Sequence, residues 1–216
     1  MKTPKAAPKP VSQKPYHHGD LATELLAAAE AELAENGIEA FSLRAVAKRA
    51  GVSHGAPAHH FGDAKGLLTA LAAIGYERLV ASQNARQAAA KSNPTAQRIA
   101  AGLGYIDFAI AHPALFRLMF SSEKPDRTEP RFAEVSVAAF DKLVAEVQQY
   151  VGADPYTDTA AMLDVMASWS MVHGLADLII SGRADRAMGF NKMSPAARDK
   201  ALSDLISRTI KPEAVR

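Results

Sequence analysis

The segment "SLRAVAKRAGVSHGAPAHH", residues 42–60, predicts two short helices joined by a tight turn. Ser42 is a favourable N-cap residue, and apolar residues recur after it at the spacing of one helix face. Gly51 ends this first helix, because glycine readily adopts the left-handed backbone conformation found at helix ends. Ser53 is placed to cap a second helix over about residues 54–60. The segment therefore has the pattern of a helix-turn-helix.

The second predicted helix is rich in small residues and in histidine. In a helix-turn-helix, the second helix enters the DNA major groove while the first crosses the DNA backbone. Small residues would let the helix backbone approach the bases, and histidine rings can donate hydrogen bonds to phosphates or base edges. The residues concerned are Gly55, Ala56 and Ala58, with His54, His59 and His60. A tight connection between core helices, with the histidines simply on the surface, fits the same spacing.

The charged residues are unevenly distributed, although the net charge is only +2. Residues 1–19 hold four lysines and no acid, and residues 20–39 hold six acids and no base. Residues 40–62 hold two arginines and one lysine, expected on the outer face of the first short helix, and no acid. The acid-free blocks could face a polyanion, and the acidic block indicates a solvated helix face. Residues 1–15, rich in Lys, Pro and Ala, predict a disordered basic tail.

The composition predicts a cytoplasmic protein with a sizeable core. Of the 216 residues, 48% are apolar and none is cysteine, which excludes disulfides and fits a reducing compartment. No run of about 18 apolar residues occurs, so we expect no membrane span. The N-terminal stretch lacks the apolar segment of a secretory signal.

Helical periodicity covers most of the chain, and no strand pattern or internal repeat is evident. We predict an all-α protein of about nine helices. Besides the helix-turn-helix, the pattern predicts helices over about residues 21–36, 64–90, 94–111, 114–120, 131–151, 156–181 and 195–210, with irregular chain at 182–194.

Several stretches resemble the tetracycline-repressor (TetR) family of bacterial transcription regulators. "GIEAFSLRAVAKRAGVSHGAPAHHFGDAKGLLTAL", residues 37–71, resembles its DNA-binding domain. "YHHGDL" (16–21) is a typical opening of one subgroup. "YIDFAIAHPALFRLMF" (105–120) and "WSMVHGLADLI" (169–179) resemble the C-terminal domain of that subgroup, which carries a Trp-x-x-x-His-Gly signature. The resemblance implies an all-α homodimer that binds operator DNA and a small effector.

The resemblance also implies which residues meet DNA. Ser42 and Arg44 would contact phosphates, and the recognition helix would carry His54, Gly55, Ala56, His59 and His60. The full set of expected DNA-binding residues is Ser42, Arg44, Ser53, His54, Gly55, Ala56, His59, His60 and Lys65. Two positions depart from the family pattern: Ala58 stands where an aromatic is usual, and Ala64 where a lysine is usual. Both lost groups contact the DNA backbone in the family, so we expect weaker operator binding, or compensation by Lys65, the basic tail or protonated histidines.

The resemblance divides the chain into three parts. Residues 1–15 form the tail, and residues 16–66 form the DNA-binding domain, whose linking helix continues to about residue 90. Residues 94–216 form the effector-binding and dimerisation domain. The 156–181 helix and the last helix would make a two-fold interface, which predicts a palindromic operator. An effector that shifts residues 105–120 would move the linking helix, so that effector and DNA binding exclude each other.

A cavity inside the C-terminal domain is implied by the resemblance, and its apolar helices supply candidate lining residues. These are Tyr105, Phe108, Phe116, Met119, Phe120, Met162, Met166, Trp169 and His173. Polar residues are scarce among them, which indicates an apolar or amphipathic effector. His173 could contact the effector, although a buried histidine satisfied by the backbone is the plainer interpretation.

Other functional classes find little support in the sequence. No paired carboxylates, nucleophile elbow or phosphate-binding glycine loop appears, so we expect no enzyme and no cofactor. Adjacent histidine pairs point in different directions on helices and have no Cys or carboxylate to complete a metal site. The open alternative is a helical small-molecule-binding or interaction module with weak or lost DNA binding.

Overall fold

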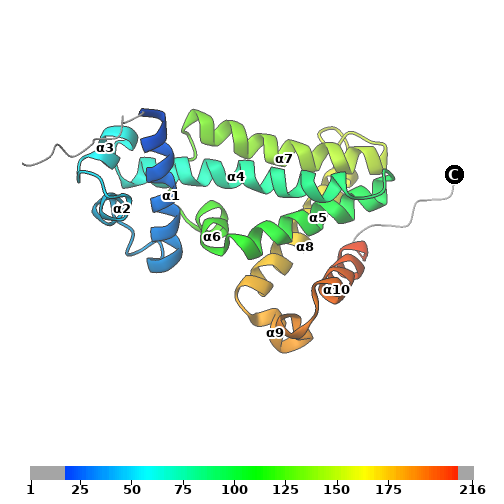
Figure 1. Ribbon diagram of the computed structural model, residues 1–216. Helices are drawn as coiled ribbons and strands as arrows, with labels where there is room; N and C mark the ends of the chain where they lie inside the picture. Colours follow the sequence, from blue (N-terminus) through cyan, green and yellow to red (C-terminus); the bar gives the residue numbers. More distant parts are fainter. Residues whose placement is uncertain (1–17, 209–216) are drawn as a thin grey trace, which may run out of the picture.

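The computed structural model describes residues 18–208, with side chains from Leu21, and has an elongated all-helical shape (Figure 1). The all-α prediction is confirmed, with ten α-helices rather than about nine in this part of the chain. The predicted basic tail, residues 1–15, lies outside the described residues. The helices are α1 (His18–Asn36), α2 (Leu43–Ala50), α3 (Ala56–Phe61), α4 (Ala64–Ala88), α5 (Pro94–Ala111), α6 (Pro113–Ser121), α7 (Pro130–Val151), α8 (Thr159–Ile180), α9 (Arg183–Met188) and α10 (Pro195–Ser207), with a 3-10 turn at Phe190–Lys192.

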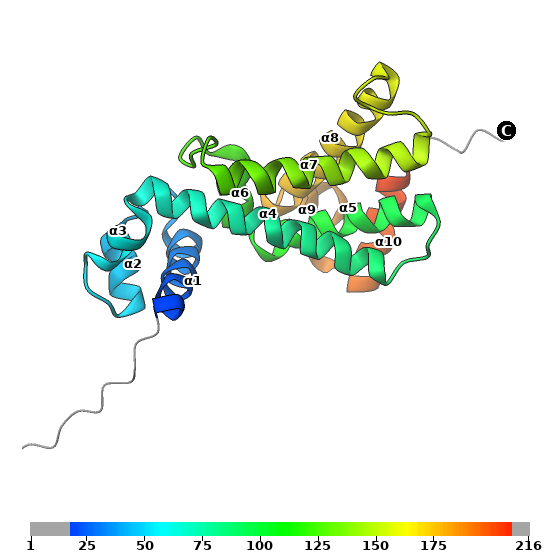
Figure 2. The ribbon, with the colours of Figure 1, turned by 90° about the horizontal axis from the view of Figure 1, so that it is seen from above.

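The long helix α4 connects the two ends of the molecule. Helices α1, α2 and α3 pack together at one end, and α4 runs from there through the remaining helices (Figures 1 and 2). Helix α7 lies along α4, and α5 packs against it from another side. One continuous helix therefore belongs both to the N-terminal unit and to the C-terminal helical layers.

Local sequence sets where the helices begin. Ser42 caps α2 through its Oγ, which accepts a hydrogen bond from Ala45 N at 3.3 Å. Asp63 caps α4 in the same way, accepting from Gly66 N at 2.8 Å. Proline occupies the first turn of α5, α6, α7 and α10, where its missing N–H removes no helical hydrogen bond. These caps explain why most boundaries were predictable.

The start of α3 differs from the prediction. The helix begins at Ala56, not near His54, and no side chain caps it. Ser53 instead accepts a backbone hydrogen bond from Ala56 N at 3.0 Å, which closes a turn. Pro57 lies in the first turn of α3, the helical position that proline favours. His54 and Gly55 therefore belong to the turn that precedes the second helix.

Two further expectations need correction. The segment 182–194, predicted as irregular, contains α9 and the 3-10 turn.

The acidic residues of α1 do not simply face solvent. Glu32 accepts from Arg49 of α2 at 3.1 Å, and Glu30 pairs with Arg78 of α4 at 2.7 Å. These ion pairs join α1 to α2 through Arg49 and to α4 through Arg78.

Helices α4 and α5 approach closely at a glycine. A Cβ atom added at Gly104 would lie 2.5 Å from Gln83 Cα and 2.7 Å from the Ser82 carbonyl oxygen. A hydrogen bond of 2.8 Å from Ser82 Oγ to the Gly104 carbonyl oxygen joins the two helices at the same point. Only glycine allows this spacing, so α4 and α5 are held together tightly beside the cavity described below.

Candidate nucleic-acid interface and helical cavity

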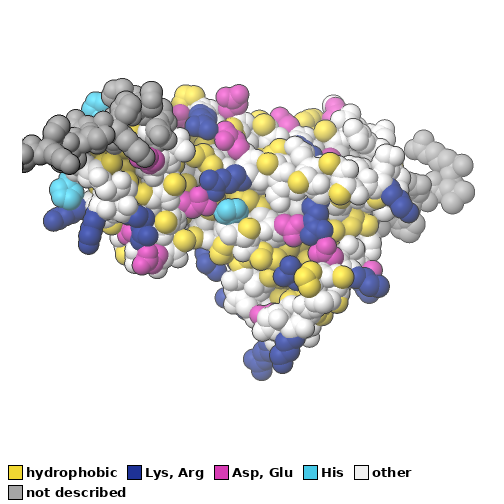
Figure 3. Space-filling model, viewed as in Figure 1, with side chains coloured by type: hydrophobic (Ala, Val, Ile, Leu, Met, Phe, Trp, Pro, Cys, Tyr) yellow, Lys and Arg dark blue, Asp and Glu magenta, His cyan; other side chains and the backbone are white. Residues whose placement is uncertain are grey.

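The surface of α2, α3 and the turn between them is accessible and basic. Lys, Arg and His side chains gather at this end of the molecule (Figure 3). Of the residues predicted to meet DNA, Ser42, Arg44, Ser53, His54, Gly55, His59 and Lys65 are exposed, and Ala56 and His60 are partly buried. The structure thus leaves seven of the nine predicted residues exposed at the surface.

Two of the three cations of the 40–62 block remain available on this face. Among the described residues, neither Arg44 nor Lys48 forms an ion pair, and both are exposed. Arg49 is different, because its guanidinium binds Glu32 and Glu35 of α1. Those contacts raise the pKa of Arg49, with the hydrogen bond to Glu35 as the largest cause. Arg49 therefore ties α2 to α1 at the surface, while Arg44 and Lys48 contribute positive charge that no acidic side chain among the described residues neutralises by direct contact.

Lys65 is exposed but engaged. Its Nζ lies 2.8 Å from Oδ2 of Asp126, in the loop between α6 and α7. This hydrogen bond is the main reason that the pKa of Asp126 lies well below its usual range. The backbone N of Asp126 also donates to Thr69 Oγ1 of α4 at 2.8 Å. The sequence analysis did not predict this contact with the loop. It leaves Lys65, which was predicted to bind DNA, paired with Asp126.

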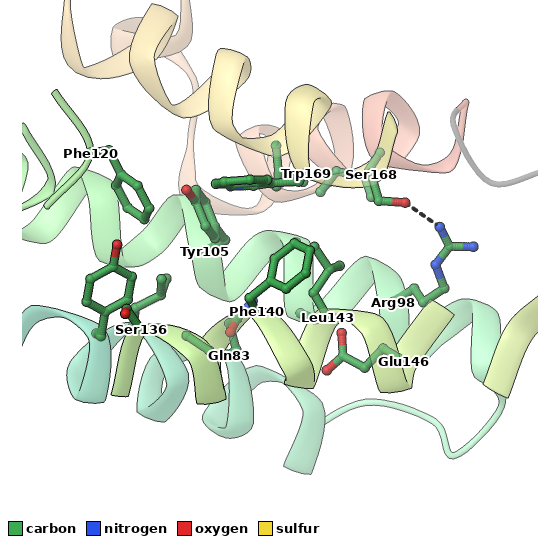
Figure 4. A pocket seen from close by; sticks show the side chains of 17 residues that line it. Gln83, Arg98, Tyr105, Phe120, Ser136, Phe140, Leu143, Glu146, Ser168 and Trp169 are labelled. Atoms are coloured by element: carbon green, nitrogen blue, oxygen red, sulfur yellow. Dashed lines mark hydrogen bonds between the residues drawn. The ribbon is translucent and has the colours of Figure 1, made fainter. Parts of the chain in front are cut away.

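A cavity of about 130 Å³ lies between the helices of the C-terminal part. Its walls come from α4, α5, α6, α7, α8 and α10 (Figure 4). Most of the lining is apolar or aromatic, with a few polar side chains among it, as is usual for small-molecule sites. The complete lining is Tyr76, Leu79, Gln83, Arg98, Ala101, Gly102, Tyr105, Phe120, Ser136, Ala139, Phe140, Leu143, Glu146, Ser168, Trp169, Val172 and Ile206.

Of the nine predicted lining residues, three border this cavity: Tyr105, Phe120 and Trp169. Met166 and His173 border a second, more open hollow, which Phe120 and Trp169 share. The other four belong to the packed interior instead: Phe108, Phe116 and Met119 are buried in the main core, and Met162 packs on a small cluster of valines. Periodicity marks all of these as inward-facing but does not separate core from cavity wall.

The sequence prediction missed the contribution of α7 and of the polar residues. Phe140 and Leu143 of α7 form one wall, and Arg98 of α5 lies at one end of the cavity (Figure 4). The helical spacing of residues 136, 140 and 143 indicates a shared face of α7. Whether that face lines a cavity or packs against another helix depends on tertiary packing, and the spacing of the residues does not reveal it.

His173 is held by side chains rather than by the backbone. Its Nδ1 lies 2.8 Å from the Tyr105 hydroxyl oxygen, and its ring stacks on Phe116 at 5.1 Å between centroids. Phe120 meets the same ring edge-on at 5.0 Å. Burial lowers the pKa of His173 and so favours the neutral form of the ring. The predicted buried histidine is thus half-buried and satisfied by a tyrosine, at the border of the second hollow.

Helix α8 carries an apolar surface that the described residues leave uncovered. Leu163 is 64% exposed and Leu178 is 44% exposed, and small residues lie between them on the same face. By length and composition α8 could cross a membrane, and the bent pair α5–α6, with its 107° break, would count as a second such span. A helix of this kind inside a helical domain needs a partner surface for its outer face.

An exposed basic helix-turn-helix, joined by one helix to a bundle that encloses a cavity, defines a helix-turn-helix DNA-binding protein. Two family models agree with this class. One, described as "Bacterial regulatory proteins, tetR family", matches residues 25–71. The other, described as "Tetracyclin repressor-like, C-terminal domain", matches residues 99–201. The chain belongs to the TetR family, whose members are transcription regulators and not enzymes.

Solved structures show the same architecture. A protein of unknown function from Rhodococcus sp. RHA1 is 32% identical, with 93% of this chain and 100% of that chain covered and a TM-score of 0.74. A TetR-like transcriptional regulator from Rhodococcus sp. RHA1 is 16% identical, with 90% and 97% covered and a TM-score of 0.63. The TetR family regulator PfmR from Thermus thermophilus is also 16% identical, with 88% and 98% covered and a TM-score of 0.63. A search of curated proteins finds no match.

Proposed function

We propose that this regulator is a ligand-responsive repressor that binds a palindromic operator as a homodimer and is released by a small apolar or amphipathic effector. The observation that carries the proposal is the single helix α4, which leaves the basic helix-turn-helix and then lines the cavity with Tyr76, Leu79 and Gln83. An occupant of the cavity would therefore touch the same rigid element that positions the DNA-binding face.

The DNA contacts follow from the accessible face. Arg44 would bind phosphate, and the Ser42 hydroxyl, whose oxygen already accepts from Ala45 N, still has its hydrogen free to donate. Ala56, His59 and His60 of α3 would lie in the major groove. Ser53, His54 and Gly55 would approach DNA from the turn rather than from the recognition helix. Lys65 would reach phosphate only after it leaves Asp126.

The homodimer is supported by the uncovered face of α8. Ala160, Leu163, Ala167, Gly174 and Leu178 are all exposed and recur at intervals of three, four or seven residues along one side of the helix. A Cβ at Gly174 would meet nothing within 4 Å, so a second helix could approach its backbone closely. The outer face of α10 is more polar, so α8 would supply most of the apolar contact and α10 the edge of a four-helix interface.

The organisation of the chain follows from these assignments. Residues 16–66 would form the DNA-binding domain and residues 94–216 the effector-binding and dimerisation domain, with α4 linking the two. The protein would act in the cytoplasm, where operator DNA is accessible. Within the Trp-x-x-x-His-Gly motif, Trp169 borders the cavity and His173 lies beside it, which supports membership of the subgroup with that signature.

Selection of bound sequences from a random duplex pool tests this function directly. We expect enrichment of a two-fold symmetric site, with half-sites separated by about one helical turn or a multiple of it. Replacing Arg44 by Gln should weaken binding to the recovered site, whereas Arg131→Gln, on the exposed surface of α7, should not. Failure to enrich any sequence at moderate ionic strength would overturn the proposal.

A second candidate function has specific support. Ala58 and Ala64 lack the usual groups for phosphate, and Lys65 is held by Asp126. These features favour a helical binding module with weak or lost DNA binding. The same selection separates the two, because such a module would bind small molecules and dimerise without enriching any duplex.

A further inference from the structure

The cavity has charged side chains at only one of its two ends, which we call the polar end (Figure 4). Arg98, Glu146 and Ser168 lie at one end, and Phe120 and Ser136 at the other (Figure 4). The rings of Tyr105, Trp169 and Phe140 lie between the two ends (Figure 4). An occupant that fills the space would thus meet an apolar wall along its length and charged groups at one tip.

The Arg98 guanidinium is only partly satisfied by its surroundings. Its Nη2 donates to Ser168 Oγ at 2.7 Å, and its Cζ lies 4.4 Å from the centroid of the Tyr150 ring. Within residues 18–208 no carboxylate lies within 4 Å of it, and no second acceptor receives a hydrogen bond from it. The described residues contain no fully buried polar side-chain atom without a partner, so the remaining Arg98 donors are accessible. Burial also lowers the pKa of Arg98.

The nearest acids do not neutralise Arg98 by direct contact. Glu146 is committed elsewhere, accepting from Lys142 Nζ at 2.6 Å and from Gln87 Nε2 at 2.9 Å. Asp164 and Glu146 act on Arg98 only as charges at longer range. The polar end of the cavity therefore has one guanidinium whose remaining donors have no acceptor within residues 18–208, beside a carboxylate that already has its own cation.

We propose that the effector is a small amphipathic carboxylic acid, bound with its carboxylate on Arg98 and its apolar or aromatic body between Trp169 and Phe140. A guanidinium binds a carboxylate through two parallel hydrogen bonds, which are stronger than neutral ones. A single cation with two acids acting at longer range favours a monoanion over a phosphate. This assignment rests on the proposed function for its biological role, since it names the effector class of the regulator.

The wild-type protein tests the assignment through its own fluorescence. Trp169 is the only tryptophan of the chain and lies in the cavity wall, so its emission reports occupancy. Two series of probes each keep the apolar group constant and change the polar head group. The first series is 4-phenylbutyrate, 4-phenylbutan-1-ol and 4-phenylbutylamine, and the second is decanoate, decan-1-ol and decylamine. We expect the acid of at least one series to bind about tenfold or more tighter than its alcohol, with the amine weakest. No preference for the acid in either series, including no binding at all, overturns the proposal.

Variants then assign the preference to one side chain. In Arg98→Gln we expect the acid and alcohol to bind within about twofold of each other, because the charge-assisted hydrogen bonds are gone. Arg98→Lys should keep part of the preference, since it retains the charge but not the paired donors. Arg131→Gln removes a comparable arginine from the outer surface of α7 and should leave the preference intact. A preference that survives in Arg98→Gln, with the fold intact by circular dichroism, also overturns the assignment.

The outcome is distinguishable from failure of the proposed function. If the protein selects an operator but shows no acid preference, the effector class is wrong and the regulator assignment stands. If acids bind through Arg98 but no duplex is selected, the ligand assignment stands and the DNA-binding function fails.

Discussion

Ala58 is an exposed methyl group on the outer face of α3, at a position where the family usually has an aromatic side chain. The structure leaves room for a larger residue there, because nothing in the described chain covers it. At the same scale, Arg98 borders the cavity and His173 borders the second hollow. Each is half-buried, and in each case burial disfavours the charged form.

Ala58→Tyr should tighten operator binding several-fold, because the phenol adds a contact to the phosphate backbone. The measurement is titration of the selected operator against wild type and variant at one fixed salt concentration. Ala85→Tyr, an exposed change on α4 away from this face, serves as the matched control and should leave affinity unchanged. An unchanged affinity in Ala58→Tyr would remove this position from the DNA contact.

Lowering the pH should destabilise the region around His173. The folded-state pKa of His173 lies below its ordinary value of 6.5, chiefly through burial, with Asp177 opposing the shift. The unfolded chain therefore takes up the proton first, so this contribution is present above about pH 6.5 and is lost as the pH falls below it. Between about pH 7.5 and pH 5.5, wild type should lose more Tm than His173→Asn. His59→Asn, an exposed control, should behave like wild type, and equal losses in all three would contradict the prediction.

At the scale of elements, the α6–α7 loop joins the two halves of the molecule. Asp126 binds Lys65 and Thr69 at the start of α4, and Lys124 lies 3.7 Å from Glu39 of the N-terminal unit. Arg127 of the same loop borders the second hollow. The loop thus contacts both the N-terminal unit and the second hollow of the C-terminal part.

Asp126→Asn should release Lys65 toward DNA. We expect tighter operator binding and a salt dependence of log K that steepens by about one unit, because one more phosphate is neutralised. Asp204→Asn breaks a comparable exposed Lys–Asp pair on α10, far from this loop, and should change neither quantity. If the effect of Asp126→Asn persists when Lys65 is also replaced by Gln, Lys65 is not the group released.

Helix boundaries were largely predictable, whereas the cavity was not. Ser42, Asp63 and Asn93 cap their helices through their own side chains, so the information is local in the sequence. The start of α3 was misplaced because Ser53 closes a turn instead of capping. The α7 wall was missed because it depends on how α7 packs against α4 and α5, and that packing joins residues far apart in the chain.

At the scale of the whole molecule, the uncovered face of α8 links assembly to function. Ala167→Glu places a charge in the middle of that face, so we expect monomers by analytical ultracentrifugation and at least about tenfold weaker operator binding. Ala145→Glu, an exposed change on α7, should leave the dimer and operator binding unchanged. A dimer that survives Ala167→Glu would move the interface to another face.

Effector and operator should reduce each other's affinity by the same factor, because the coupling free energy is reciprocal. The check uses the acid that binds most tightly in the Trp169 assay. Its affinity is measured with and without saturating operator, and operator affinity with and without the saturating acid. Equal operator affinity under both conditions would show that the cavity does not communicate with the DNA-binding face.

Because α4 is one uninterrupted helix, a small tilt at one end would produce a larger displacement at the other end. Its 25 residues span about 37 Å at the usual helical rise. A tilt of about 5° at the cavity end would carry the other end through about 3 Å, close to the roughly 3.4 Å step between successive nucleotides. In a symmetric dimer both α4 helices would tilt. A small displacement beside the cavity would therefore shift both DNA-binding faces relative to the operator by about one nucleotide step.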